Sequence, residues 1–186
     1  MQKIGVFLSA RDGLADVYVQ AAREVGKWIG STGRTLVYGG SACGLMEVLA
    51  TEVKRAGGKV WGVVPRVITE RGLESRCIDV CFPCEELADR KMILNRESDI
   101  LVALPGGIGT LDELFTVLGE AAIGMPGAKT LVLYNAGGCW DGLIGALNDL
   151  HARGFLRDNF RDRLKVVRSV EELNVLIPNT SAKEQE

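Results

Sequence analysis

The residues with the clearest chemical potential lie in one short stretch, Pro105-Gly106-Gly107-Ile108-Gly109-Thr110, which is followed by Glu113. This stretch comes after an apolar run, Ile100 to Leu104, and before a segment with helical periodicity. Glycines at a strand-to-helix turn let a ligand approach the backbone, and the unpaired amides at the helix start favour a phosphate. A phosphate cradle with a hydroxyl and a carboxylate beside it suggests a nucleotide that is chemically changed.

A second glycine-rich turn, Gly39-Gly40 to Gly44-Leu45-Met46, follows another short strand pattern. One such turn often serves only strand–helix packing, but two in the same sheet favour ligand binding. Neither turn matches the dinucleotide fingerprint. That fingerprint, Gly-x-Gly-x-x-Gly, directly follows the first strand, whereas Ser9 stands at the end of the first strand here. The Walker lysine is also missing, since Thr110 follows Gly109, so ATP hydrolysis by the P-loop route is not expected.

Each charged side chain near these turns could have a structural role or a role in a ligand site. Arg90 and Lys91 precede the Pro105 loop, and on pattern alone they favour a solvated helix face with a Glu86–Arg90 ion pair. Glu113 fits a carboxylate that suits the helix dipole, or a capping-box partner of Thr110, as well as it fits a catalytic acid. The residues by themselves leave both questions open.

The composition narrows the class of protein. The chain has 186 residues, 47% of them hydrophobic, and a formal net charge of −2, which argues against a general nucleic-acid surface. We expect one domain over 1–177 and a disordered polar tail over 178–186. With no membrane-length apolar run, no leader and an odd number of cysteines, five, the chain reads as a cytoplasmic protein without membrane contact.

Metal sites are not expected either. The chain has one histidine, His151, which excludes most zinc sites. Cys77, Cys81 and Cys84 have the spacing of some iron–sulfur enzymes, but about a hundred residues remain after them, too few for the barrel of those enzymes. The stretch Cys77 to Cys81 reads instead as a short strand, with cysteines as small apolar residues.

Strand and helix patterns alternate along the chain. We predict strands at 3–8, 35–38, 59–64, 78–82, 100–104, 130–134 and 164–167, and helices near 15–30, 43–56, 85–98, 110–123, 139–153 and 169–176. This alternation predicts a Rossmann-like, doubly wound parallel sheet in a three-layer α/β/α arrangement. The loops Ser9–Gly13, Gly39–Met46 and Pro105–Thr110 should meet in one crevice at the carboxyl ends of the strands.

Together, Pro105-Gly106-Gly107-x-Gly109-Thr110-x-x-Glu113, Arg90-Lys91 and Val37-Tyr38-Gly39-Gly40-x-x-x-Gly44-Leu45-Met46 resemble the LONELY GUY (LOG) family. Its members are cytokinin riboside 5′-monophosphate phosphoribohydrolases, long labelled possible lysine decarboxylases. The resemblance implies hydrolysis of the N-glycosidic bond of a nucleoside 5′-monophosphate, as in cytokinin biosynthesis, to free base and ribose 5-phosphate. It also implies a homodimer or larger homo-oligomer and no cofactor. Arg90 and Glu113 would be catalytic, and the substrate would contact Lys91, Gly106, Gly107, Gly109, Thr110, Gly39, Gly40, Gly44 and Met46.

The chain departs from the family pattern at several points. Leu8-Ser9-Ala10-Arg11 stands where the family often has Cys-Gly-Ser-Ser, and Gly119-Glu120 stands where a Thr-Trp pair is common. Glu70 and Glu74 are both candidates for an additional substrate-binding acid. The preferred base, cytokinin or plain adenine as in AMP, therefore stays open.

Two other functions use some of the same sequence features. A non-catalytic carrier of a nucleotide or of the molybdenum cofactor would need the glycine loops but not the Arg90 and Glu113 pair. A pyridoxal-phosphate lysine decarboxylase would need a much longer chain and a lysine suited to a Schiff base.

Overall fold

The computed structural model describes residues 1–157 and 160–179. Residues 180–186, most of the tail predicted to be disordered, lie outside this range. Within the described residues seven strands form one sheet: β1 (Lys3–Phe7), β2 (Thr35–Tyr38), β3 (Lys59–Pro65), β4 (Val80–Cys84), β5 (Ile100–Ala103), β6 (Leu131–Tyr134) and β7 (Leu164–Val167). The helices are α1 (Asp16–Ser31), α2 (Gly44–Arg55), α3 (Arg66–Glu70), α4 (Leu87–Glu97), α5 (Ile108–Ala122), α6 (Asp141–Ala152), α7 (Phe160–Arg163) and α8 (Val170–Leu176), with a 3₁₀ turn η1 (Ala136–Gly138).

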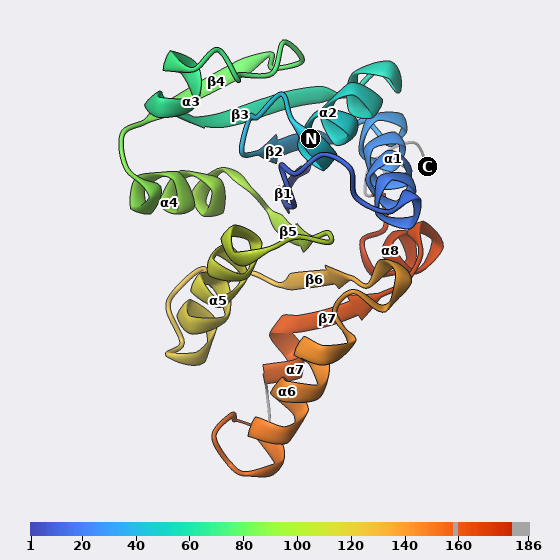
Figure 1. Cartoon of the computed structure of the whole chain (residues 1–186). Helices are drawn as coiled ribbons and strands as arrows, with labels where there is room; N and C mark the ends of the chain where they lie inside the picture. The colour runs from blue at the N-terminus through green and yellow to red at the C-terminus, as the bar shows by residue number, and fades with distance from the viewer. Residues whose placement is uncertain (158–159, 180–186) are drawn as a thin grey trace, which may run out of the picture.

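All neighbouring strands are parallel, in the order β4-β3-β2-β1-β5-β6-β7 (Figure 1). The chain builds outward from β1 to β4, returns to β5 on the other side of β1, and continues to β7. The order therefore reverses between β1 and β5, where Val6 is in register with both Tyr38 and Val102. Ligands of such sheets bind beyond the carboxyl ends of the strands at this reversal.

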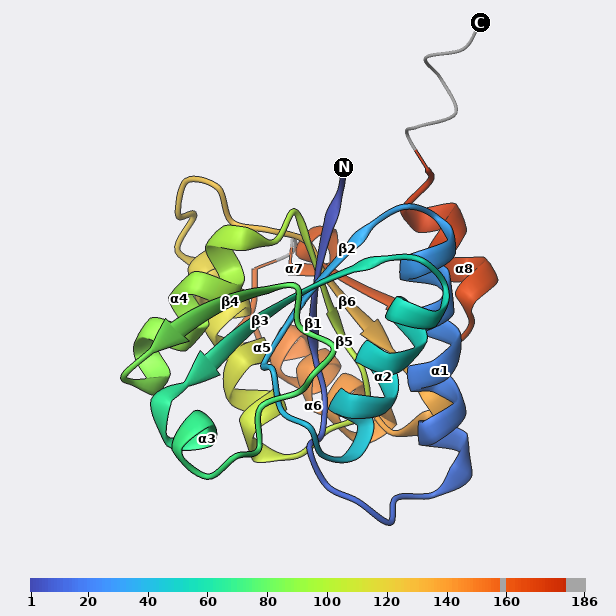
Figure 2. The same cartoon turned by 90° about the horizontal axis from the view of Figure 1, so that it is seen from above.

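Helices cover both faces of the twisted sheet (Figure 2). Helices α1, α2 and α8 pack on one face, and α4, α5 and α6 on the other. The predicted three-layer α/β/α architecture is confirmed. Because both faces are covered, the central strands are apolar at nearly every position and do not alternate with polar residues.

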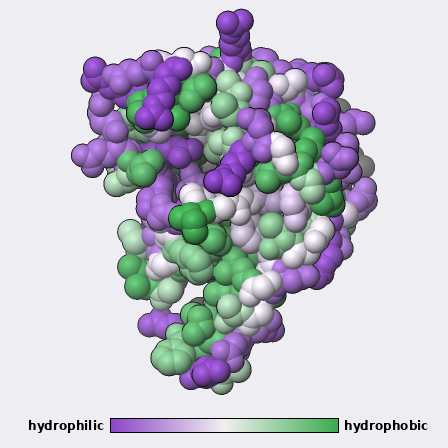
Figure 3. All heavy atoms as spheres, in the orientation of Figure 1, coloured by the Kyte–Doolittle hydropathy of each residue, from purple (hydrophilic) through white to green (hydrophobic). Residues whose placement is uncertain are grey.

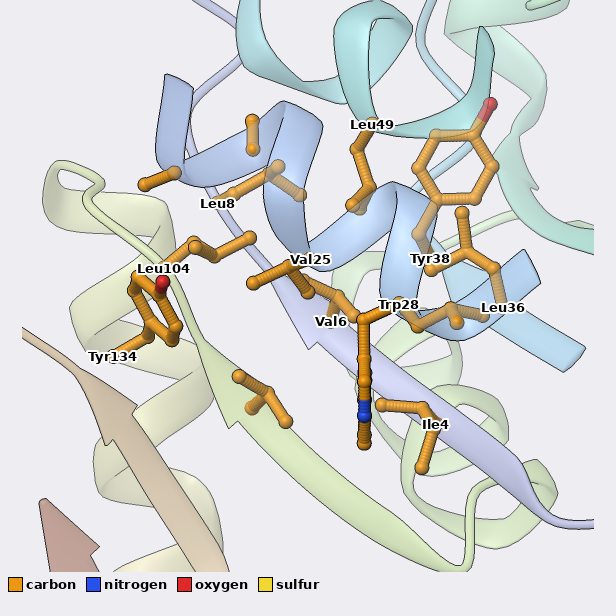
Figure 4. Close-up of a cluster of buried hydrophobic side chains, with 14 of the residues drawn as sticks. Ile4, Val6, Leu8, Val25, Trp28, Leu36, Tyr38, Leu49, Leu104 and Tyr134 are labelled. Atoms are coloured by element: carbon orange, nitrogen blue, oxygen red, sulfur yellow. The ribbon is translucent and has the colours of Figure 1, made fainter. Parts of the chain in front are cut away.

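The core consists of two clusters separated by the sheet. Figure 4 shows the first, in which Val6 of β1 meets Val25 and Trp28 of α1 and Leu49 of α2. The second lies on the opposite face and includes Phe7, the neighbour of Val6 on the same strand. Successive side chains of a strand point to opposite faces, so β1 supplies both clusters.

The sequence prediction was wrong about the position of β4, which spans Val80–Cys84 and not 78–82. Pro83 lies inside this strand and has no N–H for a sheet hydrogen bond. Because β4 is an edge strand, one missing donor is tolerated there. The segments α3, α7 and η1 were not predicted, since each is too short to show helical periodicity.

Candidate functional site

The three loops predicted to converge are joined by hydrogen bonds at the carboxyl edge of the sheet. The amide of Ser9 donates to the carbonyl of Pro105 at 3.2 Å, which links the first loop to the third. The amide of Gly44 donates to the Asp12 carboxylate at 2.9 Å, which links the first loop to the second. The three predicted loops therefore meet at this edge.

Arg90 of α4 and Glu113 of α5 face each other beside these loops. Nη1 of Arg90 lies 3.8 Å from Oε1 of Glu113, and the two side chains are only 17% and 8% exposed. Arg90 is thus not on a solvated helix face, and its ion pair is with Glu113 and not with Glu86. Glu86 instead precedes α4 and accepts the Arg90 backbone N–H through its carbonyl.

This ion pair is incompletely satisfied. A separation of 3.8 Å is too long for a hydrogen bond, and Nε of Arg90 is buried without a partner among the described residues. Burial raises the pKa of Glu113 to about 7, against the opposing effect of the Arg90 charge. A buried carboxyl with a shifted pKa and one cationic partner, placed at a ligand crevice, is typical of a catalytic group.

The capping-box interpretation of Glu113 is wrong. Helix α5 begins at Ile108, two residues earlier than predicted, and its N-cap is Gly107. Thr110 therefore lies inside the first turn and Glu113 in the second, whereas a capping box needs the hydroxyl residue at the N-cap. The early start also leaves the amides of Ile108, Gly109 and Thr110 without helical partners, because the first helical bond joins Leu111 N–H to the Gly107 carbonyl.

The outer side of the glycine loop is exposed, and the side chain of Thr110 supports its inner side. Gly107 and Gly109 are exposed, and a Cβ at either position would meet no atom within 4 Å. A Cβ at Gly106 would collide with Oγ1 of Thr110, which is 3% exposed. The Thr110 side chain thus supports the loop from below, and its backbone N–H belongs to the open helix start.

The second glycine turn contacts Arg90 at Gly39. The guanidinium lies directly against Gly39, where a Cβ would collide with Nη2, and Met46 Cε lies close to the same point. Gly40 and Gly44 have φ angles of +74° and +55°, which favour glycine. Lys91 extends the cationic side of the site, with Nζ 3.0 Å from Oδ1 of Asp112.

The two candidate acids lie in different surroundings. Glu74 forms an isolated antiparallel bridge with Ser41, in the second glycine turn. Glu70 lies at the end of α3, and its carboxylate accepts a bond from Nε of Arg66 at 2.8 Å. Of the two, Glu74 is next to the site.

Sequence reasoning missed the role of Asp12. Its carboxylate accepts the first amide of α2, and no side-chain cap comes from the adjacent residue Cys43. The two partners are 32 residues apart, so no local spacing signals the contact. Asp12 fixes the first loop over the start of α2.

The described residues also lack two features that would point elsewhere. Across 1–157 and 160–179, no group of three or more His, Cys, Asp or Glu side chains is arranged to hold a metal ion. None of the helices in this part of the chain has the length and apolar character that crossing a bilayer requires.

Comparison with protein families gives a match over residues 46–177 to the family described as "Possible lysine decarboxylase". A cytokinin riboside 5′-monophosphate phosphoribohydrolase of Mycobacterium tuberculosis is 33% identical over 91% of this chain and 89% of its own length. One of Arabidopsis thaliana is 30% identical over 86% of this chain and 70% of its own length.

Solved structures show the same fold. A molybdenum-cofactor carrier protein of Chlamydomonas reinhardtii superposes with a TM-score of 0.72, at 24% identity and with 98% of each chain covered. A molybdenum-cofactor-binding protein of Rippkaea orientalis gives a TM-score of 0.73 at 23% identity, covering 95% of this chain and 94% of that one.

Proposed function

Since this chain belongs to the family described as possible lysine decarboxylases, the LOG family of the sequence resemblance, we propose that it hydrolyses the N-glycosidic bond of a nucleoside 5′-monophosphate. The products are the free base and ribose 5-phosphate. The substrate class comprises cytokinin riboside monophosphates, as in the names of the relatives, and AMP. The observation that carries the proposal is the buried Arg90–Glu113 pair beside an open glycine loop.

The geometry suits this reaction because its transition state is charged. Cleavage of an N-glycosidic bond develops positive charge on the ribose ring, and a carboxylate close to the anomeric carbon stabilises it. Glu113 supplies that carboxylate and orients the attacking water. Arg90 binds the ribose hydroxyls or the phosphate through its planar fork of donors and holds the ring against Glu113.

The remaining site residues hold the phosphate. The free amides at the start of α5 lie in the open loop of Gly107 and Gly109, and the helix dipole favours an anion there. Lys91 adds a positive charge on the same side of α5. No metal or redox cofactor takes part in this scheme.

The family description, possible lysine decarboxylase, implies the cofactor pyridoxal phosphate, but the residues of this site do not fit that cofactor. Lysine decarboxylases of that type hold the cofactor as a Schiff base on a lysine, which requires a neutral amine. Lys91 is the lysine of the site, and its ammonium is engaged with the Asp112 carboxylate at 3.0 Å.

The molybdenum-cofactor proteins share the fold at less than 25% identity, so this similarity supports a common architecture but not a common ligand. A carrier has no need of a buried, incompletely satisfied ion pair. The catalytic proposal is therefore preferred.

The deciding experiment incubates the purified protein with AMP and with isopentenyladenosine monophosphate and follows free base and ribose 5-phosphate by chromatography. Glu113→Gln should retain AMP binding and lose at least about 100-fold in turnover, because the shape is kept and the charge is removed.

Glu120→Gln is the matched control. Glu120 is also on α5 and also contacts α4, through Nδ2 of Asn95, but it lies two turns further along the helix. This variant should keep its turnover. Full activity of Glu113→Gln would remove Glu113 from the chemistry, and AMP binding without base release by the wild type would favour a carrier.

A further inference from the structure

A cavity of about 570 Å³ lies beside the glycine loop. Gly106 and Gly107 form one wall, and Ser9 and Arg11, from the loop after β1, form part of another. Arg90 and Glu113 are not among its lining residues. The glycine loop therefore lies next to this cavity as well as next to the Arg90–Glu113 pair, at the reversal between β1 and β5.

The cavity is larger than a phosphate group requires. Its volume falls within the range of about 300–1,000 Å³ that is usual for small-molecule sites. Half-buried Leu14 and Tyr18 give it an apolar wall, and Ser9 and Arg11 add a hydroxyl and a cation. A mostly apolar cavity with a few polar groups at one end is the usual form of a site for an organic ligand.

Arg11 is held in place by its backbone. Its amide donates to Oγ of Ser9 at 3.1 Å, and its carbonyl lies so close to Gly44 that a Cβ there would collide with it. The adjacent bond from Gly44 N–H to Asp12 fixes the same loop. The Arg11 guanidinium, in contrast, has no ion pair within the described part of the chain. A guanidinium free of an internal partner is well suited to a phosphate.

We propose that this cavity receives a second group joined to the nucleotide through its phosphate, so that the chain takes nucleotides whose 5′-phosphate is part of a pyrophosphate linkage. The first phosphate would lie on the loop amides, the second beside Arg11 and Ser9, and the attached group against Leu14 and Tyr18. This inference rests on the proposed function, because it uses the same loop and the same ribose position. The bond that breaks is unchanged: water adds to the anomeric carbon, and the base leaves with a proton.

The test compares AMP with diadenosine diphosphate, two adenosines joined by a pyrophosphate, by isothermal titration calorimetry on the full chain. The wild type should bind diadenosine diphosphate about tenfold more tightly than AMP, as one additional charge-assisted contact allows. Leu14→Trp, which fills the cavity, and Arg11→Ala, which removes the cation, should each abolish most of this advantage and leave AMP affinity within about twofold.

Arg55→Ala is the control for charge, since Arg55 is an exposed arginine at the far end of α2, and its ratio of affinities should equal that of the wild type. Equal or weaker binding of diadenosine diphosphate by the wild type would overturn the inference, as would an unchanged ratio in both cavity variants, or no binding of either ligand. Release of adenine from AMP is measured on the same preparations. If adenine is not released but diadenosine diphosphate still binds more tightly than AMP, the proposed hydrolase function is wrong and the proposed cavity site stands. If adenine is released but diadenosine diphosphate does not bind more tightly, the cavity site is wrong and the hydrolase function stands.

Discussion

The absence of a side chain at Gly39 determines where the Arg90 guanidinium lies. Gly39 does not have a positive φ, so its backbone is accessible to alanine. What requires glycine is the close approach of Nη2 of Arg90, which occupies the space of a Cβ. The position of the ion pair with Glu113 thus depends on a residue that carries no functional group.

We therefore expect Gly39→Ala to displace Arg90 and to lower kcat/KM at least about tenfold, with little loss of stability because the end of a long side chain can move. Steady-state kinetics and thermal unfolding measure the two effects. Gly145→Ala is the control: it lies inside α6 with nothing within 4 Å of the new Cβ, so activity should persist and stability should rise by about 0.5–1 kcal/mol. Full activity of Gly39→Ala would contradict this account of Arg90.

The pKa of Glu113 predicts the pH dependence of the reaction. The proposed role needs the ionised carboxylate, and burial raises this pKa from 4.5 to about 7. Hence kcat/KM should fall about tenfold for each pH unit below 7 and level off above it. The sign is opposite for stability, which decreases as pH rises from 4.5 to about 7 because ionising the buried group opposes folding. If kcat/KM did not change between pH 5 and 8, the reaction would not require the ionised form of Glu113.

At the level of elements, the start of α2 depends on a residue from another loop. Removing the Asp12 carboxylate in Asp12→Ala leaves the Gly44 amide to solvent and should cost about 0.5–1 kcal/mol of the free energy of unfolding. Asp12→Asn keeps an acceptor oxygen and should retain most of that stability. Urea titrations of the three proteins compare these values, and equal midpoints would show that the bond contributes nothing.

The elements differ in how well the sequence predicts them. Buried strands such as β5 and β6 were found to within a residue because both faces are covered and the apolar runs are uninterrupted. The edge strand β4 was displaced by two residues because the prediction followed the pattern of Cys77 to Cys81, whereas the strand at the sheet edge continues through Pro83 to Cys84. Helix α5 was predicted to start late because glycines mark a turn, whereas here they continue into the helix.

The site was predictable only in part, for a related reason. Its glycine loops appear as local motifs, but the approach of Arg90 to Gly39 and the bond from Gly44 to Asp12 join residues distant in sequence. Pattern alone favoured a surface ion pair for Arg90. The resemblance to a family assigned it to the site, and the fold brings it beside Glu113.

At the scale of the whole molecule, apolar side chains gather on the surface of α5 and α6. Figure 3 shows hydrophobic residues gathered over α5 and α6, in the lower half of that view. On α5 and just beyond it, Ile108 is 83% exposed, Phe115 47% and Ile123 75%. Contiguous exposed apolar surface of this kind marks an interface in soluble proteins.

We propose that the α5 part of this surface joins two copies of the chain, in agreement with the homodimer that the family resemblance implies. The wild type should then have twice the chain mass of 20.1 kDa in light scattering coupled to gel filtration. Phe115→Glu and Ile123→Glu should each produce monomers, because a charge buried in an apolar interface is left without a partner. Val175→Glu is the matched control, since Val175 is 83% exposed on α8, which packs on the opposite face of the sheet, and this variant should stay dimeric.

A monomeric wild type, or dimers that persist in both α5 variants, would place the interface elsewhere. Because α5 also carries Glu113, the monomeric variants should lose activity together with the partner if the adjacent subunit restrains this helix.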